Sequence, residues 1–267
     1  MPIVPDTNLL RSPAQVRNII RQGGWDQPTA GLAPGFAQAN LVILPKVLAL
    51  DFFLFCQRNP KPCPLLDVTD PGNAIPARIA VDADIRTDIP RYRVYRRGEL
   101  IDEPQDIIKY WDDTMVAFLL GCSFSFEQPM LEAGIPIRHI EQGCNVPMFI
   151  TNQQCEPAGD FSGPMVVSMR PIAQNQLVDA VKITSRFPGV HGAPVHIGDP
   201  AVLGISDLQK PDFGDPVPFK PGEIPVFWAC GVTPQAVAMQ VKPELIITHA
   251  PGFMFVSDLE QNKLAVI

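Results

Sequence analysis

The chain has 267 residues, of which 46% are hydrophobic and 18% charged, and its formal net charge is −7 at pH 7. This composition supplies a substantial core, so we expect a globular protein of one large domain or two modest ones. The acidic balance and the absence of a Lys/Arg cluster argue against a nucleic-acid partner. No apolar run suffices to span a bilayer and no signal-peptide pattern opens the chain, so we expect a cytoplasmic protein without a membrane partner.

The first half of the chain predicts helices, each introduced by a proline. Ser12 fits an N-cap, with a proline at the first helical position and Gly23 as the stop. The apolar run over residues 38–58 is interrupted by Pro45, which predicts a short lead-in followed by a buried helix. Three further segments are predicted as two strands and a polar helix or loop: residues 65–69, 92–95 and 104–113.

The same local plan, an apolar strand, a tight turn and a helix start, is predicted twice. It occurs after residues 115–122, where Ser125 and Gln128 fit a capping box, and after residues 225–231, where Thr233 fits a cap. A helix N-terminus presents free N–H groups and suits a carboxylate, so two of them could hold a dicarboxylate. The alternative is that both are ordinary junctions that bind nothing. Neither turn has a nucleotide-binding glycine pattern, and no cofactor is predicted.

The middle of the chain predicts a separate part. Residues 164–171 indicate a strand and residues 172–187 a helix, and a strand over residues 245–248 closes the pattern. We therefore expect an α/β fold with a three-layer main domain built from both chain ends, residues 1–122 plus 220–267. A smaller α+β domain, residues 123–219, would be inserted, and the cleft between the two would hold the ligand.

The segment PGVHGAPVHIGDP, residues 188–200, cannot be regular structure and contains His191 and His196, two of only four histidines. Such loops often carry functional groups, although either imidazole could simply bond a turn. His191, His196 and Asp199 could ligate a metal, but their spacing matches no zinc signature, so no metal is predicted. Six cysteines without a CxxC pair predict free thiols, buried or lining a site.

Polar side chains that follow the predicted strands are the further candidates for chemistry: Cys122, Ser123, Glu127, Cys230, Thr233 and His249. A cysteine beside a helix N-terminus can have a lowered pKa and act as a nucleophile; filling a strand end is the alternative. Arg138, with its neighbour His139, and Arg170 are cations in apolar surroundings. They could bind a substrate carboxylate or form salt bridges.

Seven motifs together resemble the D-glutamate cyclase family, whose bacterial members are described as hydro-lyases. In chain order they are TAGLAPGFAQANLVILP, LLGCSFSFEQPMLEAGIP, RHIEQGCNVPMFITN, VVSMRPI, RFPGVHGAPVHIGDPAVLGI, PVFWACGVTPQ and THAPGFMFVSD. The resemblance extends over residues 13–258. It implies a two-domain α/β fold and an enzyme that cyclises D-glutamate to 5-oxo-D-proline with loss of water.

For this reaction we assign provisional roles to the candidate residues. Carboxylate binding falls to Arg170 and Arg138, and oxyanion stabilisation to the turns near Ser123 and Thr233. Proton transfer falls to His191 or His196, with Glu127 and Asp199 orienting them. Cys122 and Cys230 remain candidate catalytic thiols, and His249 a substrate-binding residue.

Two alternatives to this reaction are open at the level of the sequence. One is a hydro-lyase acting on another small hydroxy or amino acid. The other is a non-catalytic carrier or sensor of 5-oxoproline, glutamate or a related carboxylate. The expected partner is a small-molecule carboxylate in each case, and whether the chain forms a homo-oligomer is open.

Overall fold

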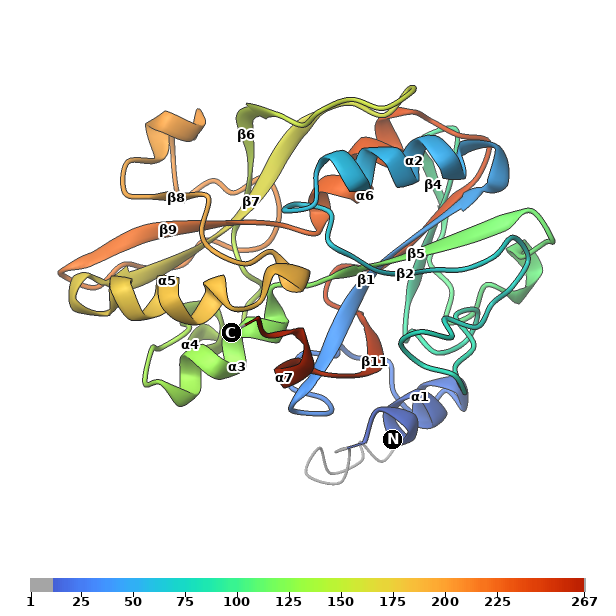
Figure 1. The fold of residues 1–267 in the computed structure, drawn as a ribbon, viewed down its shortest axis with the longest axis horizontal. Helices are drawn as coiled ribbons and strands as arrows, with labels where there is room; N and C mark the ends of the chain where they lie inside the picture. Colours follow the sequence, from blue (N-terminus) through green and yellow to red (C-terminus); the bar gives the residue numbers. More distant parts are fainter. Residues whose placement is uncertain (1–11, 267) are drawn as a thin grey trace.

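Two antiparallel sheets frame the computed structural model, which describes residues 12–266 (Figure 1). The larger sheet has seven strands, ordered β2 (Leu65–Val68), β5 (Met115–Gly121), β1 (Phe36–Pro45), β10 (Ile246–His249), β3 (Tyr92–Arg96) and β4 (Glu99–Asp102), and β11 (Phe255–Glu260) also pairs with β1. The smaller sheet has four strands, ordered β6 (Met148–Gln154), β7 (Pro164–Ala173), β9 (Glu223–Ala229) and β8 (His196–Ile197).

The prediction of mixed helices and strands is confirmed, but the three-layer α/β main domain is wrong. Every strand pair in both sheets is antiparallel. A parallel layer needs helices that cross back to the same sheet. Here α3 (Phe124–Glu132) follows β5 and leads to the smaller sheet, whereas α6 (Val232–Gln240) follows β9 and leads back to the larger one. The two strand–turn–helix units therefore carry the chain between the sheets.

Both chain ends contribute to the larger sheet, and the strands of the smaller sheet come from residues 148–229. One predicted main-domain segment, β9, pairs within the smaller sheet. The division into domains at residues 122 and 220 stays a prediction.

Strand β1 was expected only as a lead-in to the next helix, but it is a central strand of the larger sheet. Its eight inner residues are all buried, so its sequence lacks the alternation that marks a half-exposed strand. Helix α2 (Lys46–Arg58) begins directly after Pro45, as predicted.

The remaining helices are short. Helix α1 (Pro13–Arg21) has the predicted cap, because Ser12 Oγ accepts a hydrogen bond from the Gln15 amide at 3.2 Å. The other α-helices are α4 (Arg138–Gln142), α5 (Leu177–Ser185) and α7 (Gln261–Leu264), and the 3-10 turns are η2 (Ile108–Tyr110), η3 (Gln174–Gln176), η4 (Pro188–Val190) and η5 (Pro200–Leu203). Within residues 12–266, no helix combines the length and apolar character needed to cross a bilayer.

The predicted side-chain caps of α3 and α6 are wrong. Ser123 stands at the N-cap of α3 and Gly231 at that of α6, and neither helix has a side-chain cap bond. Thr233 instead bonds both backbone groups of Val166 on β7. The Thr233 hydroxyl therefore bonds the neighbouring strand β7 instead of capping α6, the role that the local pattern predicted.

The two sheets share one apolar core. Phe52 and Phe55 of α2 pack in a cluster that contains Phe118 of the larger sheet and Phe227 of the smaller one. The rings of Phe52 and Phe118 meet edge to face with centroids 4.8 Å apart. Helices α3 and α5 lie along the opposite face of the smaller sheet (Figure 1). Their buried side chains form a cluster with Trp228 of β9. The smaller sheet is thus covered on both faces.

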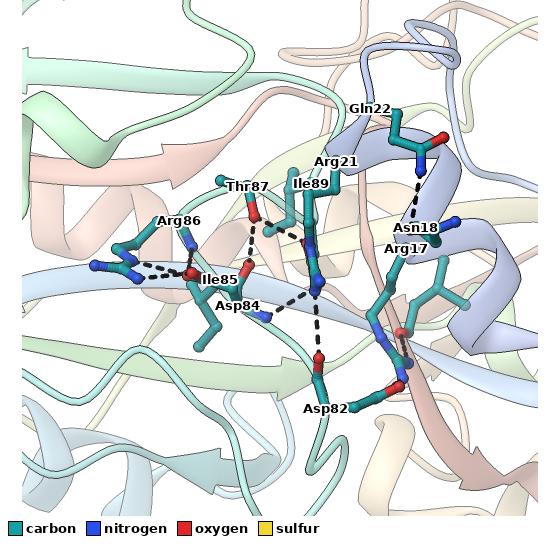
Figure 2. Close-up of polar contacts among 12 residues, drawn as sticks. Arg17, Asn18, Arg21, Gln22, Asp82, Asp84, Ile85, Arg86, Thr87 and Ile89 are labelled. Atoms are coloured by element: carbon teal, nitrogen blue, oxygen red, sulfur yellow. Dashed lines mark hydrogen bonds and ion pairs between the residues drawn. The ribbon is translucent and has the colours of Figure 1, made fainter.

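Helix α1 is attached to the rest of the fold by ion pairs (Figure 2). The buried guanidinium of Arg17 binds Asp82 at 2.5 Å and Asp258 at 2.9 Å. One turn later, Arg21 donates two hydrogen bonds, of 2.7 and 2.6 Å, to Asp88. These contacts fix the helix that precedes the loop 22–35, which forms one wall of the cavity described next.

Candidate functional site

A cavity of about 730 Å³ lies between the loop that follows α1 and the start of α3. Its walls come from residues 28–38, 124–131, 139–145 and 251–252, with single residues from other segments. The ionisable side chains among the lining residues are Glu127, His139, Cys144 and Asp215. The volume is within the range of small-molecule sites, so the cavity is the candidate ligand site.

Glu127 is the buried acidic group of this cavity, and only one of its oxygens is engaged. Its Oε1 accepts a hydrogen bond from Arg170 Nε at 2.9 Å and a second from a terminal nitrogen of the same guanidinium. His139 Nε2 lies 3.2 Å from the same oxygen. Within residues 12–266, Glu127 Oε2 has no hydrogen-bond partner. This oxygen is therefore free to act on a ligand.

The ionisation of Glu127 is set by competing effects. Burial favours the neutral acid, but the charges of Arg170 and His139 and their hydrogen bonds outweigh it and hold the pKa of Glu127 below its ordinary value. Glu127 is therefore a carboxylate near neutral pH. A carboxylate beside an imidazole orients the ring, and the two groups can accept and donate a proton, which is the arrangement of an acid–base pair.

The two arginines expected to bind substrate bind the protein's own carboxylates instead. Arg170 is fully buried, pairs with Glu127 and does not line the cavity. Arg138 donates to Glu223 at 2.5 Å and lies 3.0 Å from the carboxylate of Glu141. Salt bridging, the alternative for both residues, is what the structure contains.

The histidines of the loop 188–200 do not reach the cavity. His191 is buried, its Nδ1 lies 2.9 Å from the Lys61 carbonyl oxygen, and burial lowers its pKa to about 4. His196 Nε2 lies 2.8 Å from the carbonyl oxygen of Asp199. The Asp199 carboxylate accepts the Ala201 amide at 3.0 Å. In the described chain, no three His, Cys, Asp or Glu side chains are grouped to hold a metal ion.

The six cysteines are free thiols, and Cys122 and Cys230 are buried. Burial raises the pKa of Cys122 to about 12 and that of Cys230 to about 11. This is opposite to the lowered pKa expected at a helix start, because removal from water costs the thiolate more than the helix end returns. Neither thiol lines the cavity, whereas Cys144 does.

Three other candidates serve internal contacts. Ser123 accepts a hydrogen bond from Arg170 at 3.1 Å, immediately before the cavity-lining Phe124. The ring nitrogen Nδ1 of His249 bonds the Leu41 amide at 3.1 Å, and Thr233 bonds Val166 as described above. Of the predicted site residues, Glu127 alone therefore lines the cavity.

His139 lines the cavity, but the sequence does not single it out as a catalytic residue. It stands beside Arg138 in a short apolar segment, which indicates only a cation that could bind a carboxylate. Its ring packs against Phe124 with centroids 6.2 Å apart and faces Glu127. No spacing rule links the two residues, because α3 and α4 are separate short helices whose approach depends on packing.

The fold and the site define a class of protein. It is a two-sheet α/β protein in which an ionised carboxylate and an imidazole lie at the wall of a ligand-sized cavity. The chain belongs to the D-glutamate cyclase family, whose sequence profile matches residues 116–258.

The relatives of the chain extend over nearly its whole length. A protein of Stutzerimonas stutzeri described as "Putative hydro-lyase" is 67% identical, over 96% of this chain and 97% of the relative. Proteins of the same description from Geobacillus kaustophilus and Bacillus subtilis are 62% and 60% identical over 96% of this chain, covering 97% and 100% of themselves. Among solved structures, a nitrogen repressor-like protein of Methanococcus jannaschii matches 88% of this chain and 91% of its own, at 9% identity and a TM-score of 0.38.

Proposed function

We propose that this chain is a hydro-lyase that removes water from a small carboxylic or amino acid, with D-glutamate, cyclised to 5-oxo-D-proline, as the first substrate to test. Family membership and the hydro-lyase description of relatives at 60–67% identity support this class of reaction. The observation that carries the proposal is Glu127, an ionised carboxylate with one free oxygen, whose other oxygen lies 3.2 Å from His139 Nε2 at the cavity wall.

The chemistry of lactam formation matches what this pair supplies. The amine nitrogen forms a bond to the side-chain carboxyl carbon, a carbon–oxygen bond of that carboxyl breaks, and the oxygen leaves as water. Two protons must pass from the ammonium group to the departing oxygen. Glu127 provides the base and His139 the acid that relay them, and enclosure in the cavity brings the reacting ends together.

Dehydration of a hydroxy acid would use the same pair. The carboxylate would take a proton from a carbon next to the substrate carboxyl group, and the imidazole would protonate the departing hydroxyl. A substrate panel distinguishes the two reactions.

The charge of the cavity disfavours a second carboxylate on the ligand, which weighs for 5-oxoproline or a hydroxy acid with one carboxylate over D-glutamate with two. Among the described residues that line it, none is Lys or Arg, and Asp215 adds a further negative charge. The second candidate function is therefore a carrier or sensor that holds 5-oxoproline without converting it.

The test is to incubate the purified protein with D-glutamate, L-glutamate and hydroxy acids and to follow loss of water by mass spectrometry. Replacing Glu127 with Gln keeps the shape but removes the base, so turnover should fall at least about 100-fold. Glu132→Gln, at an exposed position of the same helix, is the matched control and should stay within about twofold. Thermal stabilisation by 5-oxoproline without conversion of any substrate would reject the enzyme in favour of the carrier.

A further inference from the structure

Arg170 is the fully buried cation that pairs with Glu127, and hydrogen bonds and aromatic rings hold its guanidinium in place. It extends from β7 of the smaller sheet, and its terminal nitrogens donate to Ser168 Oγ at 3.0 Å and Ser123 Oγ at 3.1 Å. Its guanidinium carbon lies 5.2 Å from the ring centre of Phe126 and 5.4 Å from that of Trp228. The side chain cannot swing into the cavity without breaking these contacts.

We propose that Arg170 is a positioning residue that anchors Oε1 of Glu127, so that Oε2 is the oxygen presented to the substrate. This inference rests on the hydro-lyase function proposed above. Both hydrogen bonds from Arg170 to Glu127 end on Oε1, the oxygen that His139 also contacts. Oε1 is thus contacted by three nitrogen atoms, and Oε2 is left to act on the substrate.

The anchor connects parts of the fold that approach only in the tertiary structure. Ser168 lies two residues before Arg170 on β7, so both side chains project from the same face of the strand. Ser123 stands at the start of α3, which follows β5 of the larger sheet. Arg170 therefore fixes the carboxylate of α3 relative to the smaller sheet, which α4 also contacts through β7.

Arginine suits this position better than lysine would. Its planar guanidinium donates in several directions at once and stacks on aromatic faces, whereas an ammonium group is a compact point charge. A lysine could keep the positive charge beside Glu127 but could not reproduce the two hydrogen bonds to Oε1 together with those to Ser168 and Ser123.

Loss of Arg170 has a definite electrostatic consequence. The titratable groups around Glu127 are Arg170, His139 and the thiol of Cys122. Without the guanidinium, burial prevails and the pKa of Glu127 rises. The carboxylate would then be lost at a higher pH, and the acidic limb of the activity profile would move upward.

The experiment compares Arg170→Lys and Arg170→Gln with the unchanged protein. With the substrate found in the panel, kcat should fall at least about 10-fold in both variants while KM stays within about twofold, because the substrate does not touch Arg170. The acidic limb should move to higher pH in Arg170→Gln. A second measurement does not depend on activity. The δ-carbon of Glu127 is labelled with ¹³C, and its NMR signal is assigned with Glu127→Gln. In Arg170→Gln this signal should report that the carboxyl group titrates at a higher pH than in the unchanged protein.

Arg17→Lys is the matched control. Arg17 is equally buried and pairs with Asp82 and Asp258, but it lies outside the cavity wall. Its replacement should lower the melting temperature without moving the acidic limb or the Glu127 titration. An equal shift in Arg17→Lys, or an increase in KM with unchanged kcat in Arg170→Lys, would overturn the positioning role.

A milder variant covers the case in which the Arg170 variants do not fold. Ser123→Ala leaves Arg170 in place but removes one of its hydrogen bonds, so kcat should fall several-fold with little change in KM. Unchanged kcat and an unchanged Glu127 titration in this variant would reject the inference. If no substrate is converted but the NMR titration shifts as described, the electrostatic contact between Arg170 and Glu127 stands, and the proposed function fails together with the positioning role.

Discussion

His191 and His249 are buried histidines, and in each of them Nδ1 bonds an internal partner. His249 Nδ1 is 3.1 Å from the Leu41 amide and 2.8 Å from the side-chain nitrogen of Gln235. Because an amide N–H can only donate, this nitrogen must be the unprotonated acceptor. Burial lowers the pKa of both histidines from 6.5 to about 4. The fold therefore depends on both rings remaining neutral.

The free energy of unfolding should accordingly fall as the pH drops from 6.5 toward 4. In that range the unfolded chain binds protons on these histidines and the folded chain does not, and the loss is complete only below the folded pKa. Each histidine should contribute about 3 kcal/mol to this loss. Urea unfolding at several pH values measures it.

His249→Asn tests this assignment, because its side-chain oxygen can accept the Leu41 hydrogen bond but does not titrate. The pH dependence should become shallower by about 3 kcal/mol over the same range. An unchanged slope in His249→Asn would contradict the assignment.

The turn between β5 and α3 depends on a close approach of two backbone segments. A Cβ added to Gly121 would lie 2.1 Å from the Gly189 carbonyl oxygen and 2.9 Å from a methyl of Val190. The Gly121 carbonyl oxygen also accepts a hydrogen bond from Asn40 at 3.0 Å. The loop that contains His191 therefore packs on the start of the element that presents Glu127, which gives this loop a structural role.

Gly121→Ala should destabilise the protein by about 3 kcal/mol or more, because neither backbone segment can move away freely. Gly189→Ala is the matched control on the other side of the same contact. A Cβ there meets only Leu264, at an ordinary 3.6 Å, so the unfolding free energy should change by less than about 1 kcal/mol. Thermal unfolding of both variants measures the difference, and equal melting temperatures would rule out the clash.

The shared core predicts that the two sheets unfold together. Phe52 is fully buried among side chains of both sheets, including Phe118 and Phe227. Phe52→Ala should cost about 3–5 kcal/mol, and hydrogen exchange should accelerate equally in β1 and β7. Two separate unfolding transitions, with only one sheet affected, would instead support two independently folding domains at the predicted boundaries.

Much of the local structure could be predicted from the sequence, whereas Glu127 alone of the predicted site residues lines the candidate site. The cap at Ser12, the helix after Pro45 and the two strand–turn–helix units depend on neighbouring residues, and all are present. Strand β1 could not be predicted from the sequence, because a strand buried on both faces lacks the alternation of apolar and polar residues that indicates a strand.

The motifs of the chain determined its family and the ends of many of its elements, because turns, prolines and apolar runs act over a few residues. Only the tertiary structure decided which way the sheets run and that Glu127, His139 and Arg170 meet at one carboxylate oxygen. These three residues come from α3, α4 and β7, and no local preference links them. Burial and charge pairing act between segments distant in the chain, so the site exists only once the two sheets have packed together.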